Sequence, residues 1–140
     1  MGAVFGNEIY HIETPDFLES ENIATLEMFN ILVAIRVWAK KWQHKSIKIH
    51  CDNSAVVAVL NNGKTRDKML ATIARNIFMA AAQWDIDLDI CHVAGKLNNI
   101  ADLLSRWQNT VSQRTQLESW IPAPLWCDIH NENILLDYEI

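Results

Sequence analysis

The stretch 46–55 constrains the fold most, because it reads as a strand that runs directly into a helix. Ile47, Ile49 and Cys51 alternate with polar residues, which is the period of a strand with one buried face. An Asn-Ser pair of the kind favoured at helix starts follows, then an apolar run and an Asn-Asn-Gly sequence typical of a helix C-terminus. The sequence therefore predicts a strand that ends at position 51 or 52 and a helix over 55–60.

Asp52 lies at the junction of these two elements. In open α/β sheets, ligands bind in the crevice at the carboxyl ends of the strands, so a carboxylate at this point is a candidate functional group. The simpler alternative is that Asp52 caps the following helix, since Asp is a preferred N-cap residue. The residue pattern alone leaves both interpretations open.

Bulk properties limit the classes of protein to consider. A chain of 140 residues is long enough for one domain with a real core. The net charge of −5 means that no global basic field attracts nucleic acid, so any such binding needs a local patch. Three widely spaced cysteines without a CxxC pair favour reduced thiols, and no apolar run reaches membrane-spanning length. We expect an intracellular protein, in the cytoplasm or nucleus, that does not enter a membrane.

Hydrophobic periodicity predicts the other elements. They are strands at 2–5 and 9–12 joined by a Gly-Asn turn, helices at 23–42, 69–84 and about 98–107, and a strand at 85–90. This order predicts a mixed α/β sheet with helices on its faces. The polar composition of 108–140 predicts an extended tail or connector, so we expect a domain at 1–107 and a tail at 108–140.

Three acidic residues stand at the ends of predicted elements: Glu27, Asp52 and Asp102. Taken singly, Glu27 reads as an exposed helix residue, and Asp102 as a first-turn charge that suits the helix dipole. Element ends of this kind can meet at one edge of a sheet. Clustered carboxylates repel and need a cation, and hard oxygen ligands select Mg²⁺ or Mn²⁺. Three further acids at 85, 87 and 89 read more simply as charges on an edge strand.

Three segments, 22–27, 51–57 and 92–107, follow one another in an order that resembles a known family. Together they resemble the ribonuclease H domain of retroelement reverse transcriptases, of the DIRS-like or LTR type. The third segment, which reads His-Val-Ala-Gly-Lys-Leu-Asn-Asn-Ile-Ala-Asp-Leu-Leu-Ser-Arg-Trp, is the most specific. The resemblance covers 2–107, and the tail resembles the connector that follows such domains.

The resemblance implies a ribonuclease H-like mixed sheet with helices on both faces and a four-carboxylate site for two Mg²⁺ ions. It implies hydrolysis of the RNA strand of an RNA·DNA hybrid, with RNA recognised through its 2′-hydroxyls, and the rest of a reverse transcriptase polyprotein as a partner. Glu27, Asp52 and Asp102 would be three of the four catalytic, metal-binding carboxylates. Candidate nucleic-acid contacts lie near the second motif and in two basic segments: Lys41, Lys45, Asn53, Lys64, Arg66 and Lys68.

One departure from the family concerns the first catalytic Asp and its strand, which the resemblance places before Gly2. We expect the chain to lack both, and so to cleave very poorly although it resembles an endonuclease. The alternative is a catalytically inactive ribonuclease H-like module that binds nucleic acid or scaffolds a polymerase. An integrase or transposase of the same fold fits less well, because that group usually closes its site with Glu where Asp102 stands.

The truncated first strand also predicts a structural consequence. The family places that strand between the strands at 2–5 and 47–51, which would otherwise face a gap. The two strands could pair directly, or the segment 133–138 could insert between them. We expect either a gap in the sheet with marginal stability, or an edge-to-edge dimer.

Overall fold

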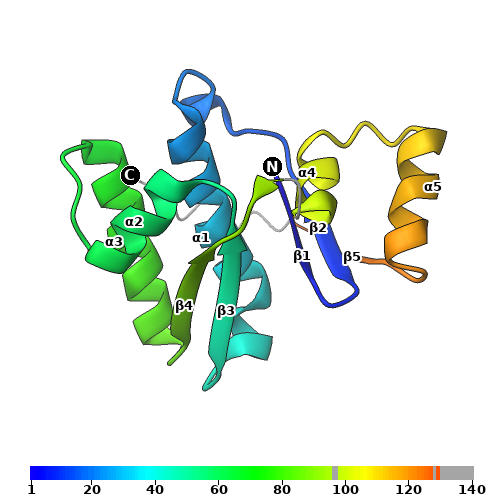
Figure 1. Ribbon diagram of the computed structural model, residues 1–140. Coiled ribbons are helices and arrows are strands. Elements are labelled where there is room, and N and C mark those ends of the chain that lie inside the picture. Colours follow the sequence, from blue (N-terminus) through cyan, green and yellow to red (C-terminus); the bar gives the residue numbers. More distant parts are fainter. Residues whose placement is uncertain (96–97, 128, 130–140) are drawn as a thin grey trace.

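The computed structural model describes residues 1–95, 98–127 and 129, and it shows a mixed α/β arrangement (Figure 1). The elements in chain order are β1 (Gly2–Phe5), β2 (Glu8–His11), the 3-10 turn η1 (Asp16–Leu18), α1 (Ile23–Trp42), β3 (Ser46–Cys51), α2 (Ser54–Asn62), α3 (Lys68–Gln83), β4 (Asp87–His92), α4 (Asn99–Ser105), α5 (Val111–Trp120) and β5 (Leu125–Trp126). The elements predicted within 1–107 are confirmed, with shifted ends. Strand β4 begins two residues late because Asp85 adopts a positive φ of 50° in the preceding turn.

Helix α1 is the central element. It begins at Ile23 because the side chain of Asn22 accepts a hydrogen bond from the Thr25 amide, which satisfies a free helix N–H. It ends before His44, whose φ of 61° is incompatible with a right-handed helix. Its apolar side contributes more residues to the main core than any other element, and it contacts β1, β3, α2 and α3. Both sheets are therefore positioned by the same helix.

The strands form two separate sheets. Strands β1 and β2 form an antiparallel hairpin, to which β5 adds in parallel on the outer side, whereas β3 and β4 pair in parallel. Within the described residues, β1 and β3 face each other without pairing. The divided sheet agrees with one of the two expected outcomes, and neither direct pairing nor a substitute strand closes it among these residues. The expected marginal stability and the alternative of a dimer stay predictions. The segment 133–138 lies outside the described residues.

Helices cover both faces of the hairpin. Ala3, Phe5 and Tyr10 pack into the main core with α1. Alternate residues point the other way, so Val4 and Ile9 pack with α4 and α5 in a second, smaller core. The gap between the sheets therefore has α1 on one face and α4 on the other.

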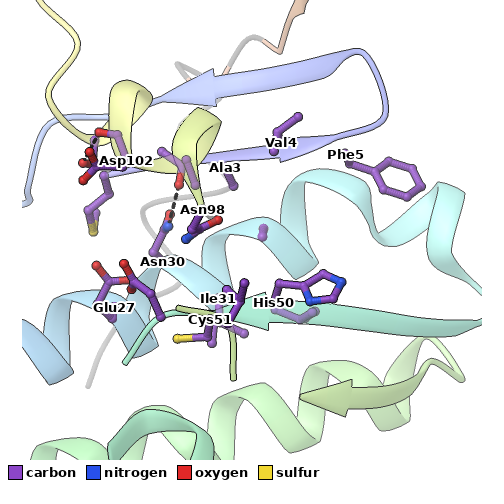
Figure 2. Close-up of a pocket in the computed structure, with 18 of the residues that line it drawn as sticks. Ala3, Val4, Phe5, Glu27, Asn30, Ile31, His50, Cys51, Asn98 and Asp102 are labelled. Carbon is purple, nitrogen blue, oxygen red and sulfur yellow. Dashed lines mark hydrogen bonds between the residues drawn. The ribbon is translucent and has the colours of Figure 1, made fainter. Parts of the chain in front are cut away.

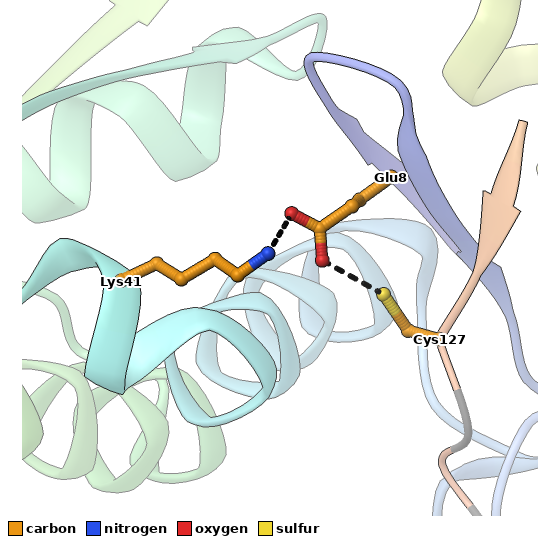
Figure 3. Close-up of polar contacts among 3 residues, drawn as sticks. All are labelled: Glu8, Lys41 and Cys127. Carbon is orange, nitrogen blue, oxygen red and sulfur yellow. Dashed lines mark hydrogen bonds and ion pairs between the residues drawn. The ribbon is translucent and has the colours of Figure 1, made fainter.

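The tail is more structured than the sequence predicted. We expected 108–140 to be extended, but α5 forms because Thr110 and Gln113 make a reciprocal capping box. Further along, Cys127 donates a 3.8 Å hydrogen bond to Glu8, which is also ion-paired with Lys41 (Figure 3). These contacts and the buried Ile129 dock the described part of the tail onto the 1–107 region.

Among residues 1–95, 98–127 and 129, none of the helices combines the length and apolar character needed to cross a bilayer.

Candidate carboxylate site between the two sheets

A groove of about 580 Å³ occupies the gap between β1 and β3. Its walls are the strands β1 and β3, and residues of α1 and α4 line it from either face. One end is polar, with the carboxyl groups of Glu27 and Asp102 on facing helices, while Phe5 lies toward the other end (Figure 2). The sequence-predicted carboxylates therefore gather at one end of one groove.

Glu27 enters the groove from the second turn of α1. Its side chain is partly buried, so the simpler expectation of an exposed helix residue is wrong. The Asn22 cap fixes where α1 begins and hence which helical face Glu27 occupies. One turn later on the same face, Asn30 donates a 2.8 Å hydrogen bond to the Gly2 carbonyl, which ties α1 to β1.

Asp52 follows β3 at the same end of the groove. It does not cap α2, because the N-cap is Asn53, whose side chain accepts a 3.1 Å hydrogen bond from the Val56 amide. Ligand atoms of Glu27, Cys51 and Asp52 all lie within 4.8 Å of one another. The capping interpretation of Asp52 is thus replaced by one in which its carboxylate stands beside that of Glu27.

Asp102 approaches from the opposite wall, in the first turn of α4. Its carboxylate also forms an ion pair of 3.2 Å with Arg106, one turn further along the helix. This pairing offsets part of its negative charge, yet Asp102 is close enough to influence Glu27. The three predicted carboxylates therefore share one cavity, with Glu27 and Asp52 the closest pair.

The electrostatics of the groove disfavour a charged Glu27. Burial raises its pKa above the ordinary value, and the negative charges of Asp52 and Asp102 raise it further, while the ammonium group of Met1 partly offsets them. A cation bound between these groups would reverse both effects, because it replaces lost hydration and offsets the repulsion. The groove therefore concentrates negative charge around a partly buried carboxyl group, which is a setting that a cation would stabilise.

The chemistry of the donor set fits a hard divalent cation. Glu27, Asp52 and Asp102 offer carboxylate oxygens, which suit Mg²⁺ or Mn²⁺. Cys51 is the soft exception, but it is 4% exposed, and burial above all raises the pKa of its thiol to about 11. Cys51 is buried in the main core, and without a metal its thiol is neutral at physiological pH.

Two site residues were not predicted from the sequence. Asn98 lines the groove at the start of α4, and a side-chain carbon added at Gly95 would lie 3.5 Å from the Asp52 carboxylate. Both belong to the loop between β4 and α4, within the third motif. The signal for them was that loop's position after a strand parallel to β3, since the ends of parallel strands meet at one edge.

The predicted nucleic-acid contacts are dispersed. Lys41 is paired with Glu8 and lies fourteen residues after Glu27, about 21 Å along the helix axis. Lys45 stands at the same far end, before β3. Asn53 uses its side-chain oxygen as the α2 cap. The remaining residues occupy the segment between α2 and α3 and the first turn of α3: Lys64, Arg66 and Lys68. The structure therefore brings the carboxylates together, and of the predicted contacts Asn53 adjoins Asp52, whereas Lys41 and Lys45 stand at the far end of α1.

Comparison of the chain with protein-family models, curated proteins and solved structures gives no match. The site's geometry and the motifs are consequently the basis for any functional proposal.

Proposed function

We propose that this chain is a ribonuclease H-like domain of a retroelement reverse transcriptase, which binds RNA·DNA hybrids and uses a divalent-cation site related to that of the nuclease. The observation that carries the proposal is the convergence of Glu27, Asp52 and Asp102 in one groove. The three residues come from three separate motifs that lie far apart in the sequence.

The roles of the residues follow from their positions. Glu27 and Asp52 would hold a Mg²⁺ or Mn²⁺ ion between them, since their carboxylates are adjacent. Asp102 would complete the anionic cluster from the facing helix. When bound, such an ion lowers the pKa of water and stabilises a departing oxygen. Asn98 and the main chain at Gly95 would border the substrate side of the cluster.

The expected hydrolytic activity of this chain is weak. Three carboxylates are one fewer than the resemblance implies for holding two ions, and two-metal catalysis needs enough anionic oxygens to position both. The arrangement therefore supports cation and hybrid binding more strongly than turnover. The alternative function, a catalytically inactive module that binds nucleic acid or scaffolds a polymerase, is favoured by this same carboxylate count.

The test uses the full chain with a labelled RNA·DNA hybrid, in Mg²⁺ or Mn²⁺ and in EDTA. We expect hybrid binding that strengthens with the cation, together with very slow or undetectable cleavage. The matched variants are Asp52→Asn, which should abolish the cation effect, and Asp89→Asn, which changes an acid on β4 and should not.

Different outcomes separate the alternatives. Robust cleavage that is lost in Asp52→Asn would establish a nuclease. It would contradict the alternative of a catalytically inactive module. Equal binding of hybrid, duplex DNA and single strands, unaffected by cation, would contradict a ribonuclease H-like role of either kind.

A further inference from the structure

A second cavity, of about 330 Å³, is bordered by α5, β5 and the loop after α4. We call it the tail pocket. Two tryptophans, Trp107 and Trp126, line it together with the charged residues Arg114 and Glu118. It shares none of its described lining residues with the groove, and α5 lies on the side of the molecule opposite to α3 (Figure 1). The tail pocket is therefore separate from the carboxylate site.

The two tryptophans form an aromatic surface that stays half exposed. Their ring centroids lie 5.2 Å apart, and the ring planes are inclined by 48°. Trp107 packs against the smaller core, whereas Trp126 is 48% exposed. Leaving an indole ring in water forgoes the free energy that its burial would give. Trp126 therefore offers a flat face, supported by Trp107, on which a planar ligand can stack.

Hydrogen bonds fix the main chain on both sides of each tryptophan. The residues that flank Trp126 donate amide hydrogen bonds of 2.8 and 2.9 Å to the β1–β2 hairpin. The Gln113 side chain donates a 2.9 Å hydrogen bond to the carbonyl before Trp107 and accepts one of 2.8 Å from the amide after it. A surface that is ordered before binding loses little conformational entropy when a ligand occupies it. The tail pocket is therefore pre-organised.

The charged groups of the pocket are not paired with each other. Arg114 and Glu118 stand one turn apart on α5, and both line the pocket. Opposite charges at this spacing can form an ion pair, but neither side chain has an ion pair or a hydrogen bond within the described part of the chain. The β-carbons of residues at this spacing are about 5–6 Å apart, which is comparable to the separation of the two hydrogen-bonding edges of a purine. Both side chains are therefore free to meet one planar ligand.

We propose that the tail pocket binds a guanine base of single-stranded nucleic acid. The base would stack on the exposed face of Trp126, as bases do on aromatic side chains. The Arg114 guanidinium would donate to the guanine O6 and N7 atoms, and the Glu118 carboxylate would accept from its N1–H and N2 amino groups. Adenine has an amino group in place of O6 and no N2 amino group, so it would satisfy neither side chain fully. This binding does not rest on the carboxylate site or on the proposed function.

Other ligands with affinity for tryptophan fit the charges less well. A proline-rich peptide offers carbonyl oxygens to Arg114, but proline has no N–H to donate to Glu118. A methylated ammonium group suits the rings and Glu118, but the Arg114 guanidinium would repel it. The net charge of −5 also limits contacts with phosphates, so recognition should depend on the base more than on the backbone.

The test follows the indole N–H signals of the labelled full chain by NMR, in EDTA, during titration with the oligoribonucleotides UUGUU, UUAUU and UUUUU. We expect saturable shifts of the Trp126 signal, with UUGUU binding at least about fivefold more tightly than the other two, because both charged side chains pair fully with guanine alone. EDTA removes divalent cations, and these oligonucleotides form no hybrid. Failure here would therefore leave the proposed function unaffected, and failure of the cation test would leave the tail pocket unaffected.

Three variants separate stacking from hydrogen bonding. Trp126→Ala should weaken UUGUU binding at least about fivefold through lost stacking, and Trp126→Phe should restore part of it. Trp120→Ala is the matched control and should bind as the wild type does, because Trp120 is an exposed tryptophan of α5 that does not line the pocket. Glu118→Gln changes an exposed side chain and should leave the fold intact, but it should reduce the preference for guanine over adenine to below about twofold.

Several results would overturn the proposal. They are the absence of a saturable Trp126 shift, equal affinity for the three oligonucleotides, and an unchanged preference in Glu118→Gln. Tighter binding of a polyproline peptide at Trp126 would overturn it as well. So would nuclear Overhauser contacts between Trp126 and residues 130–140, which would assign the pocket to the chain's own tail.

Discussion

The two ends of the groove differ in what they do for the fold. At one end, Phe5, Trp38 and Trp42 form an aromatic cluster with ring centroids 5.5–5.7 Å apart. At the other end, Glu27 and Asp52 place two carboxylates side by side. Aromatic contacts of this kind stabilise a core beyond their buried area, whereas adjacent partly buried carboxylates destabilise it. The aromatic end stabilises the fold, and the carboxylate end is the part of the groove where we propose that a cation binds.

The largest loss of stability is expected from a substitution in the aromatic cluster. Trp38→Ala removes a side chain that is 2% exposed and contacts three other rings, and should lower the free energy of unfolding by about 3–5 kcal/mol. Urea denaturation followed by circular dichroism measures this. Trp120→Ala is the control, because Trp120 is 39% exposed and its loss should change stability by about 0.5 kcal/mol or less. Equal losses in the two variants would show that the cluster is not part of the core.

A smaller loss is expected where α4 meets β1. A side-chain carbon at Gly2 would lie 2.5 Å from the Leu104 β-carbon and 2.8 Å from its main-chain carbon. Gly2→Ala should therefore displace α4, which carries Asp102, and destabilise by about 1–3 kcal/mol. Thermal unfolding measures the loss. Gly95→Ala, which meets only an ordinary contact, should be close to neutral, and an equally stable Gly2→Ala would contradict the close approach of α4 to β1.

A substitution at the carboxylate end should raise the stability of the fold, in contrast to the two substitutions above. The variant Glu27→Gln removes a charge that the fold disfavours. In metal-free buffer at pH 7, its free energy of unfolding should therefore be about 1 kcal/mol higher than that of the wild type. Because the pKa of Glu27 is raised in the folded chain, Glu27 loses its proton at a lower pH in the unfolded chain than in the folded chain. Wild-type stability should then fall as pH rises from about 4.3 through the folded pKa. Above that range the variant's advantage should be constant, and below it the advantage should disappear.

Thermal melts of both proteins from pH 4 to pH 8 in EDTA provide the measurement. A variant that is less stable than wild type at pH 7 would show that Glu27 makes a structural contact and is not a strained ligand.

The last prediction concerns the reactivity of the Cys51 thiol, at the end of β3 directly before Asp52. Because burial holds the pKa of its thiol at about 11, Cys51 should react with iodoacetamide at pH 8 far more slowly than the partly exposed Cys91. Peptide mass spectrometry resolves the two sites. Faster labelling of Cys51 than of Cys91 would indicate an accessible thiolate and reopen its role as a ligand.

Local signals predicted much of this arrangement. The periodicity of α1 and β3 and the cap residues were sufficient for the elements, and three motifs were sufficient to select Glu27, Asp52 and Asp102. Sequence did not decide between Asp52 and Asn53 as the α2 cap, because both residue types suit that position. It missed α5, although Thr110 and Gln113 have the spacing of a capping box. Asn98 and Gly95 were missed because the sequence did not show that β4 pairs with β3, and this pairing places their loop beside Asp52.

The central claim is that the carboxylate end of the groove binds a divalent cation, and Mn²⁺ titration followed by electron paramagnetic resonance tests it most directly. We predict that the full chain removes free Mn²⁺ from solution, that Asp52→Asn weakens this binding at least tenfold, and that Asp89→Asn leaves it unchanged. Absence of Mn²⁺ binding by the folded chain, or binding that is equal in the wild type and Asp52→Asn, would contradict the claim.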